Sequence, residues 1–182
     1  MPSERLSLAE NGMGSYSLDD LAEKSFNKLR ALYVSAAAPH DLSTLGRRPT
    51  GRMLAIRGLG ARPVFRLLRS AARSRYFPWN GKTLGTDDST RGFGANRVNL
   101  LGERHWFPYE TRIDASVIDG ADTIVFDYAP RSPWPARYLY DELREVSQGV
   151  FLGPVLLKVR RTRFIMVLWF AVDANKQSHR TP

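Results

Sequence analysis

The sequence predicts a mainly β (α+β) domain, in which a helical N-terminal segment precedes an antiparallel β-sheet or barrel. Three observations support this fold class. The chain has 182 residues, a length that suits one domain. Apolar residues make up 43% and charged residues 25%, as in ordinary globular proteins. After Phe77, short apolar runs alternate with turn sequences, which is the pattern of antiparallel strands that follow one another along the chain.

The expected domain limits follow from the same pattern. Residues 1–16 are polar and are expected to form a disordered leader, residues 17–173 a single domain, and residues 174–182 a disordered tail. Within the domain, residues 17–76 are the helical, Arg-rich part, and residues 77–173 are the barrel part.

The helical part is expected to begin with a helix from Leu18 to about Tyr33. Ser17 can cap this helix, and Asp20 stands three residues further on, as a capping box requires. Apolar residues recur through the stretch at helical spacing. A second helix is expected over residues 63–75, because the segment begins with proline, which is favoured at the first helical position.

The rest of the chain is expected to be β-structure of at least six strands, closed or nearly so, because closure removes exposed sheet edges. Asp119-Gly120 is a favoured hairpin pair between two of the strands. Residues 52–57 fit a short strand or a turn of helix, and residues 138–146 fit a short helix or a strand. The six expected strands are Trp79–Leu84, Phe93–Leu101, His105–Ser116, Thr123–Tyr128, Val150–Val159 and Phe164–Val172.

The formal net charge of +9 is concentrated in one part of the sequence. Residues 42–86 contain ten Lys and Arg residues and no Asp or Glu, while the rest of the chain is close to neutral. Nine of these ten cations are Arg, which forms bidentate contacts with carboxylate and phosphate groups. This Arg-rich block predicts either an acidic partner or polyanion, such as nucleic acid, or only a solvated basic face.

Composition also excludes several classes of site. Cysteine is absent, which rules out disulfides and thiolate metal sites and agrees with a cytoplasmic location. The longest apolar run, residues 164–172, is too short for a transmembrane helix, and no signal peptide is visible. The three histidines are not spaced as metal ligands, and no nucleophile-elbow motif occurs, so neither a metal nor a cofactor is predicted.

Polar residues gather between Asp127 and Glu145, next to a proline-rich break in the β region. The ordinary interpretation is that Asp127 caps a turn and that Asp141 and Arg144 lie on a solvated face. The functional alternative is that these three side chains point into a cavity, where a buried carboxylate beside Arg could act as a base or hold a polar ligand group. Asp127 and Asp141 are therefore the catalytic candidates, if any reaction occurs.

Aromatic residues are the other signal, because fifteen of the twenty follow residue 76. Most of them are expected to be core, but small barrels also use aromatic side chains to line an apolar pocket that carries a few polar anchors. Tyr109 and Arg112, on one expected strand, are candidate anchors, with Asn96 and Arg97 on the strand before it.

The β part resembles uncharacterised bacterial proteins of the lipocalin-like (calycin) type. The resemblance lies in W-N-G-K at residues 79–82, D-Y at 127–128, D-E-L-R at 141–144 and L-G at 152–153, within a stretch from about Arg52 to Asp173. It implies an antiparallel up-and-down lipocalin-like β-barrel with a ligand cavity, and it implies no defined reaction. The lipocalin G-x-W signature does not occur, and the expected last strands contain no histidine to bind haem.

Three functions remain open on the sequence. The favoured one is binding of a small lipophilic or mixed-polarity ligand in the barrel cavity, without catalysis. The second is a small barrel enzyme of the isomerase, cyclase or dehydratase type, with a buried Asp and Tyr or Arg partners. The third is polyanion binding through the Arg-rich block. The expected ligand-binding residues, which should gather near one end of the barrel, are Tyr109, Arg112, Asp127, Tyr128, Asp141 and Arg144.

Overall fold

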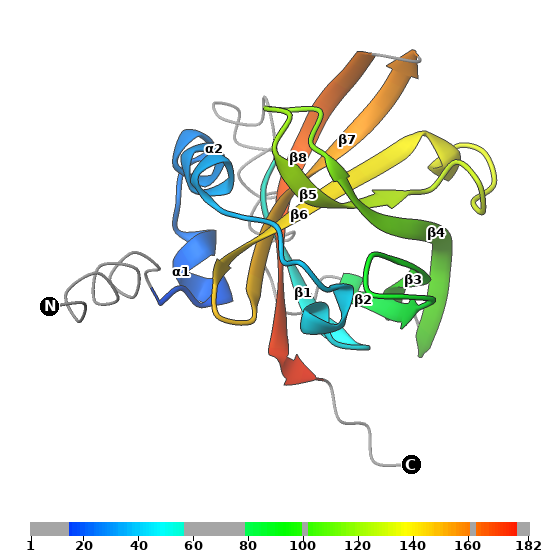
Figure 1. Ribbon diagram of the computed structural model, residues 1–182, viewed down its shortest axis with the longest axis horizontal. Coiled ribbons are helices and arrows are strands. Elements are labelled where there is room, and N and C mark those ends of the chain that lie inside the picture. The colour runs from blue at the N-terminus through cyan, green and yellow to red at the C-terminus, as the bar shows by residue number, and fades with distance from the viewer. Residues whose placement is uncertain (1–14, 57–78, 100–101, 161–162, 178–182) are drawn as a thin grey trace, which may run out of the picture.

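A computed structural model describes residues 15–56, 79–99, 102–160 and 163–177. Eight antiparallel strands follow one another in chain order and close into a barrel (Figure 1). The strands are β1 Pro49–Ile56, β2 Trp79–Thr86, β3 Arg91–Asn99, β4 Glu103–Ala115, β5 Asp122–Asp127, β6 Leu139–Ser147, β7 Val150–Arg160 and β8 Arg163–Gln177.

The last strand closes the ring. β8 pairs antiparallel with β7 on one side and with β1 on the other, so that the first and last strands are neighbours. The prediction of an antiparallel sheet of at least six strands is confirmed. The two segments that the sequence left open are both strands: residues 52–57 fall largely in β1, and residues 138–146 fall largely in β6.

The helical part differs in detail from the expectation of one long helix. The capping box at Ser17 and Asp20 is present, but it begins a short helix, α1 Leu18–Ala22. A second helix, α2 Phe26–Ser35, follows at once, because the Ser25 side chain accepts a hydrogen bond from the backbone N–H of Lys28 and starts a new helix. The helix expected over residues 63–75 lies outside the described residues.

Helices α1 and α2 cover one outer face of the barrel (Figure 1). Leu21, Leu29 and Tyr33 from the helices are buried against Trp169 and Ala171 of β8. Because both helices bury their apolar side here, this part of the barrel wall is shielded from water. Among the described residues, no helix has the length and apolar character needed to cross a membrane.

A separate apolar cluster lies on the inner side of the ring. It includes Phe126 of β5, Leu143 of β6, Phe151 of β7 and Phe170 of β8. In a strand, alternate residues point to opposite faces, so these side chains share the inner face while their chain neighbours face outward. A 3-10 helix at Leu42–Leu45 buries its two leucines in the same cluster and covers one end of the barrel.

Candidate functional site

The barrel contains a partly open cavity of about 390 Å³. Its wall is mostly apolar and is built from several strands, with Val98, Val155, Leu168 and Phe170 among the lining residues. The polar side chains that line it are few, chiefly Asn96, Tyr128 and Asp141. These three belong to one hydrogen-bonded cluster, which therefore defines the polar side of the cavity.

The centre of this cluster is Lys82, whose side chain is only 1% exposed. Its ammonium Nζ lies 2.7 Å from Asp141 Oδ2, 2.7 Å from the Tyr128 hydroxyl and 3.2 Å from Asn96 Oδ1. An ammonium group has three hydrogens, so each of them has an acceptor. Lys82 is not among the described residues that line the cavity. It lies behind Asn96, Tyr128 and Asp141.

The other donor atoms of the cluster, Tyr128 Oη, Asn96 Nδ2 and Trp79 Nε1, each make one hydrogen bond within it. The Tyr128 hydroxyl donates to Asp141 Oδ2 at 2.8 Å and accepts from Asn96 Nδ2 at 3.0 Å. The Trp79 indole N–H donates to Asn96 Oδ1 at 3.0 Å. Within the described residues, one polar atom of the cluster is left over: Asp141 Oδ1 is buried and has no hydrogen-bond partner.

Burial controls the electrostatics of this cluster. Desolvation lowers the pKa of Lys82, and the neighbouring Asp141 carboxylate opposes part of that effect. Desolvation likewise raises the pKa of Tyr128 and Tyr109 well above the ordinary value for tyrosine, so both phenols stay neutral. Aromatic faces add to the stabilisation of the ammonium, which lies 4.6 Å from the Phe126 ring centre and 4.8 Å from that of Tyr109.

A β-bulge explains how Trp79 and Lys82 both reach the interior. Residues three apart in a regular strand point to opposite faces. The pairing of β2 with β3 is irregular between Trp79 and Gly81, and the extra residue shifts the alternation. Gly81 has a φ of 123°, which favours glycine. The W-x-G-K sequence thus places an indole on the cavity wall and an ammonium behind it.

A second bulge shapes the opening of the cavity. Phe107 of β4 has a φ of 55°, and the register with β3 shifts at this point. As a result both Trp106 and Phe107 line the cavity although they are consecutive. They are 41% and 36% exposed, so they form the edge of the cavity that faces solvent.

The structure brings three of the six expected binding residues into the barrel interior. Tyr128 and Asp141 line the cavity, as described above. Tyr109 packs against the Tyr128 ring with centroids 5.4 Å apart, and its hydroxyl donates to the Thr83 carbonyl at 2.7 Å. Tyr109 is therefore part of the support behind the polar cluster.

Two of the other expected residues lie together on the outer face. Arg112 donates to Asp114 at 2.8 Å, and its guanidinium is 3.9 Å from Asp127. Asp127 also accepts the backbone N–H of Ala129 at 3.0 Å, as a turn-capping carboxylate does. Strand alternation explains the separation, because Asp127 immediately precedes Tyr128 and faces the opposite side.

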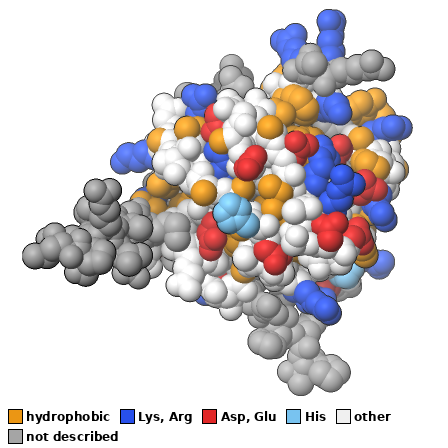
Figure 2. All heavy atoms as spheres, viewed as in Figure 1, with side chains coloured by type: hydrophobic (Ala, Val, Ile, Leu, Met, Phe, Trp, Pro, Cys, Tyr) orange, Lys and Arg blue, Asp and Glu red, His pale blue; other side chains and the backbone are white. Residues whose placement is uncertain are grey.

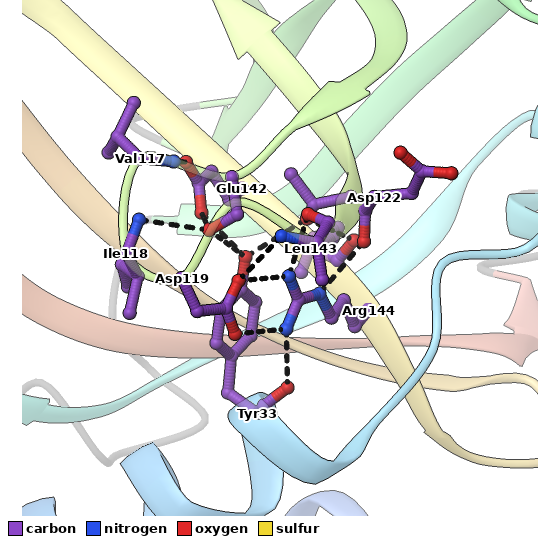
Figure 3. A network of polar contacts seen from close by, with 11 residues as sticks. Tyr33, Val117, Ile118, Asp119, Asp122, Glu142, Leu143 and Arg144 are labelled. Atoms are coloured by element: carbon purple, nitrogen blue, oxygen red, sulfur yellow. Dashed lines mark hydrogen bonds and ion pairs between the residues drawn. The ribbon is translucent and has the colours of Figure 1, made fainter.

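The sixth residue, Arg144, is buried between the barrel and α2 (Figure 3). It forms a bidentate pair with Asp119, at 2.6 and 2.8 Å, and donates to the backbone carbonyls of Tyr33, Ala121 and Asp122. All five N–H groups of the guanidinium are used in this way. The contacts tie the C-terminal turn of α2 to the turn between β4 and β5.

Glu142 forms a neighbouring network under the same helix (Figure 3). Its carboxylate accepts hydrogen bonds from the Tyr33 hydroxyl at 2.5 Å, the Ser116 hydroxyl at 2.6 Å and the backbone N–H of Val117 at 2.8 Å. Burial beside this carboxylate raises the pKa of Tyr33. Consecutive residues of β6 thus serve different sites: Asp141 faces the cavity, and Glu142 anchors the helix.

Sequence reasoning missed Lys82 as a site residue, because it was counted with the Arg-rich block. A signal was present: in the expected strand 79–84, Lys82 shares a face with Leu84, which indicates a lysine on an apolar face. Asn96 was considered as an anchor but not chosen. Trp79 was noted as the start of an expected strand and for the resemblance, but not as a site residue.

The structure describes four cations of the Arg-rich block. Lys82 is buried, Arg48 pairs with Glu103, Arg52 pairs with Asp19, and Arg47 is exposed. The other six cations lie outside the described residues. On the face seen in Figure 2, basic side chains are interspersed with acidic and apolar ones. Binding of an acidic partner stays a prediction.

Comparisons with known proteins add little. No protein-family model matches the chain, and no curated protein matches it. The crystal structure of a protein from Thermomonospora curvata resembles this one with a TM-score of 0.43 and 16% sequence identity, over 85% of this chain and 90% of that chain. Function is therefore argued from the site alone.

Proposed function

We propose that the protein binds a small, mainly apolar ligand in the cavity of its barrel. The observation that carries the proposal is the cavity of about 390 Å³, with apolar walls and one polar cluster. Small-molecule sites span roughly 300–1,000 Å³ and combine apolar walls with a few polar groups that fix the ligand's orientation. A lipocalin-like (calycin) relationship, based on the W-N-G-K and D-E-L-R segments, is part of the same proposal.

The solvent-facing edge supports this function. Trp106 and Phe107 are partly exposed aromatic residues, and the strained backbone of Phe107 places its ring at the cavity. Strained conformations of this kind persist where the surrounding structure or the function holds them. An aromatic edge of this sort gives an apolar ligand a partly desolvated route from water to the cavity.

A fluorescence titration with N-phenyl-naphthylamine tests the proposal, since this neutral probe becomes bright in apolar surroundings. We expect saturable binding to the wild-type protein. Val98→Phe should abolish or strongly weaken it, because Val98 lines the cavity and a larger side chain fills the space. Val159→Phe, the same change at an exposed position, is the matched control and should bind as the wild type does. Equal binding by all three proteins would contradict the proposal.

A small barrel enzyme is the second candidate. One observation favours it: Asp141 lines the cavity, and its buried Oδ1 has no protein partner in the described chain, so the carboxylate could accept a proton from a bound substrate. Incubation with a lipophilic cell extract, followed by mass spectrometry of the bound and free molecules, separates the two functions. A molecule recovered chemically changed by the wild-type protein, and unchanged by a variant without Asp141, would favour the enzyme.

A further inference from the structure

The ligand's chemistry can be inferred from the hydrogen-bond groups that the cluster leaves open. A buried lysine at an apolar cavity would ordinarily indicate an anionic ligand, such as a fatty acid. Here the three hydrogens of Lys82 already have acceptors, in Asp141, Tyr128 and Asn96. The Tyr128 hydroxyl hydrogen is used as well, on Asp141 Oδ2. The cluster therefore holds its ammonium and phenol donors away from a ligand.

The polar atom of the cluster that has no hydrogen-bond partner among the described residues is an acceptor, Asp141 Oδ1. Asp141 is 4% exposed and lines the cavity, and its Oδ1 has no partner among the described residues. A buried polar atom without a hydrogen bond is costly, and a hydrogen bond to a charged group is stronger than one between neutral groups. A ligand that donates a hydrogen bond to Oδ1 would remove this cost.

The charge of the cluster narrows the ligand class further. The Lys82 ammonium and the Asp141 carboxylate compensate each other as a buried ion pair. An anionic ligand would place its charge next to the Asp141 carboxylate, which repels it. A cationic ligand would leave one uncompensated positive charge in an apolar cavity, which is also unfavourable.

From these three steps we infer that the ligand is a neutral, mainly apolar molecule with a hydroxyl or N–H group, and that this group donates a hydrogen bond to Asp141 Oδ1. The inference rests on the proposed function, because it concerns the same cavity. It adds the selectivity: alcohols and related neutral donors bind in preference to carboxylic acids, ethers and hydrocarbons of the same length.

Displacement of N-phenyl-naphthylamine by matched competitors tests this selectivity. Decanol and methoxynonane are isomers of the same length, and only decanol has a donor hydrogen. We expect decanol to bind about tenfold or more tightly than methoxynonane, as the loss of a hydrogen bond to a charged acceptor predicts. Decanoate and decylamine should both compete less well than decanol. Equal affinity of the alcohol and the ether, or tightest binding by decanoate or by decylamine, would overturn the inference.

A double variant, Lys82→Met/Asp141→Leu, tests whether Asp141 causes the preference for decanol over methoxynonane. It replaces the ion pair by apolar side chains, a change that proteins often tolerate. Its preference for decanol over methoxynonane should fall to about onefold, and a preference kept in the folded variant would refute the assignment to Asp141. If the variant does not fold, the wild-type competitor series still decides the inference. If the wild-type protein binds neither probe nor competitors, the proposed function fails first, and the inference fails with it.

Discussion

Lys82 Nζ lies 2.7 Å from Asp141 Oδ2, and this ion pair crosses the inside of the barrel. Lys82 is on β2 and Asp141 is on β6, four positions apart in a ring of eight strands, so the pair joins opposite walls. The same contact connects the two walls and holds one oxygen of the Asp141 carboxylate, while the other oxygen, Oδ1, is buried without a partner among the described residues. Stability and ligand binding are thus linked through one side chain.

The first prediction concerns this pair. Asp141→Asn leaves a buried ammonium without its counter-ion, so we expect the free energy of unfolding to fall by about 3–5 kcal/mol. The double variant Lys82→Met/Asp141→Leu removes both charges and should be close to wild type, or more stable. Urea denaturation followed by circular dichroism measures both effects. The prediction fails if the single variant is as stable as the wild type. Asp114→Asn, at a half-exposed position, is the control.

The second prediction concerns pH and the lowered pKa of Lys82. Between this lowered pKa and about 10.4, the unfolded chain binds more protons at Lys82 than the folded protein does. The free energy of unfolding should therefore rise with pH in that interval, with a slope of at most about 1.4 kcal/mol per pH unit. The rise is measured as wild type minus the double variant, which reduces the contribution of Tyr109 and Tyr128, because burial, the main cause of their raised pKa values, is present in both proteins. The upper end of the interval is the ordinary lysine pKa of about 10.4. If the difference in unfolding free energy between the two proteins stays flat or falls from pH ~7 to that value, Lys82 keeps an ordinary pKa.

The third prediction separates two arginines that sequence reasoning placed in one site. Arg144 is fully buried with every N–H group bonded, whereas the Arg112 side chain is 35% exposed. Arg144→Lys cannot keep the bidentate pair with Asp119 and should cost about 3–5 kcal/mol of stability. Arg112→Lys should cost less than about 1 kcal/mol. Thermal unfolding of the two variants decides this, and equal losses would contradict the structural role of Arg144.

The fourth prediction concerns acid. The Arg144 guanidinium holds the pKa of Asp119 below its ordinary value. A carboxylate of this kind contributes stability above its unfolded pKa of about 3.9, and the contribution is lost as the pH falls through the lower folded value. Asp119→Asn should therefore be less stable than wild type at pH 7, and the difference should shrink below pH ~4. Asp122→Asn, at an exposed position at the start of β5, should show no such pH-dependent difference.

The fifth prediction concerns the bulge that brings Trp79 and Lys82 to one side. At Gly81, a Cβ atom would meet the Pro49 carbonyl oxygen at 2.2 Å, and φ is 123°. Gly81→Ala should cost about 1–3 kcal/mol or more and weaken probe binding, because Trp79 moves with the bulge. Gly120→Ala is the control: φ is 77°, but a Cβ atom there meets nothing within 4 Å. Its cost should be about 1 kcal/mol, with probe binding unchanged.

Local sequence signals predicted helices and strands correctly where a single signal favoured one structure. The capping box at Ser17 and the strand alternation around Phe126 have short-range causes, and both are present in the structure. The division between α1 and α2 was missed, because Ser25 is both an acceptable helix residue and a good N-cap. Propensity alone does not choose between these roles, and packing against β8 does.

The sequence by itself determined a mainly β, antiparallel chain with a helical start, because the period of apolar residues sets which backbone form can bury them. It also placed Asp141 and Tyr128 among the candidate site residues, and it left open whether the aromatic residues fill a core or line a pocket. Only the tertiary structure decided which polar residues meet. Ring closure brings β2 opposite β6, and single-residue alternation and two bulges decide which side chains face inward. A shift of one residue would have exchanged Asp141 with Glu142, so the identity of the cavity carboxylate depends on register, which the fold fixes as a whole.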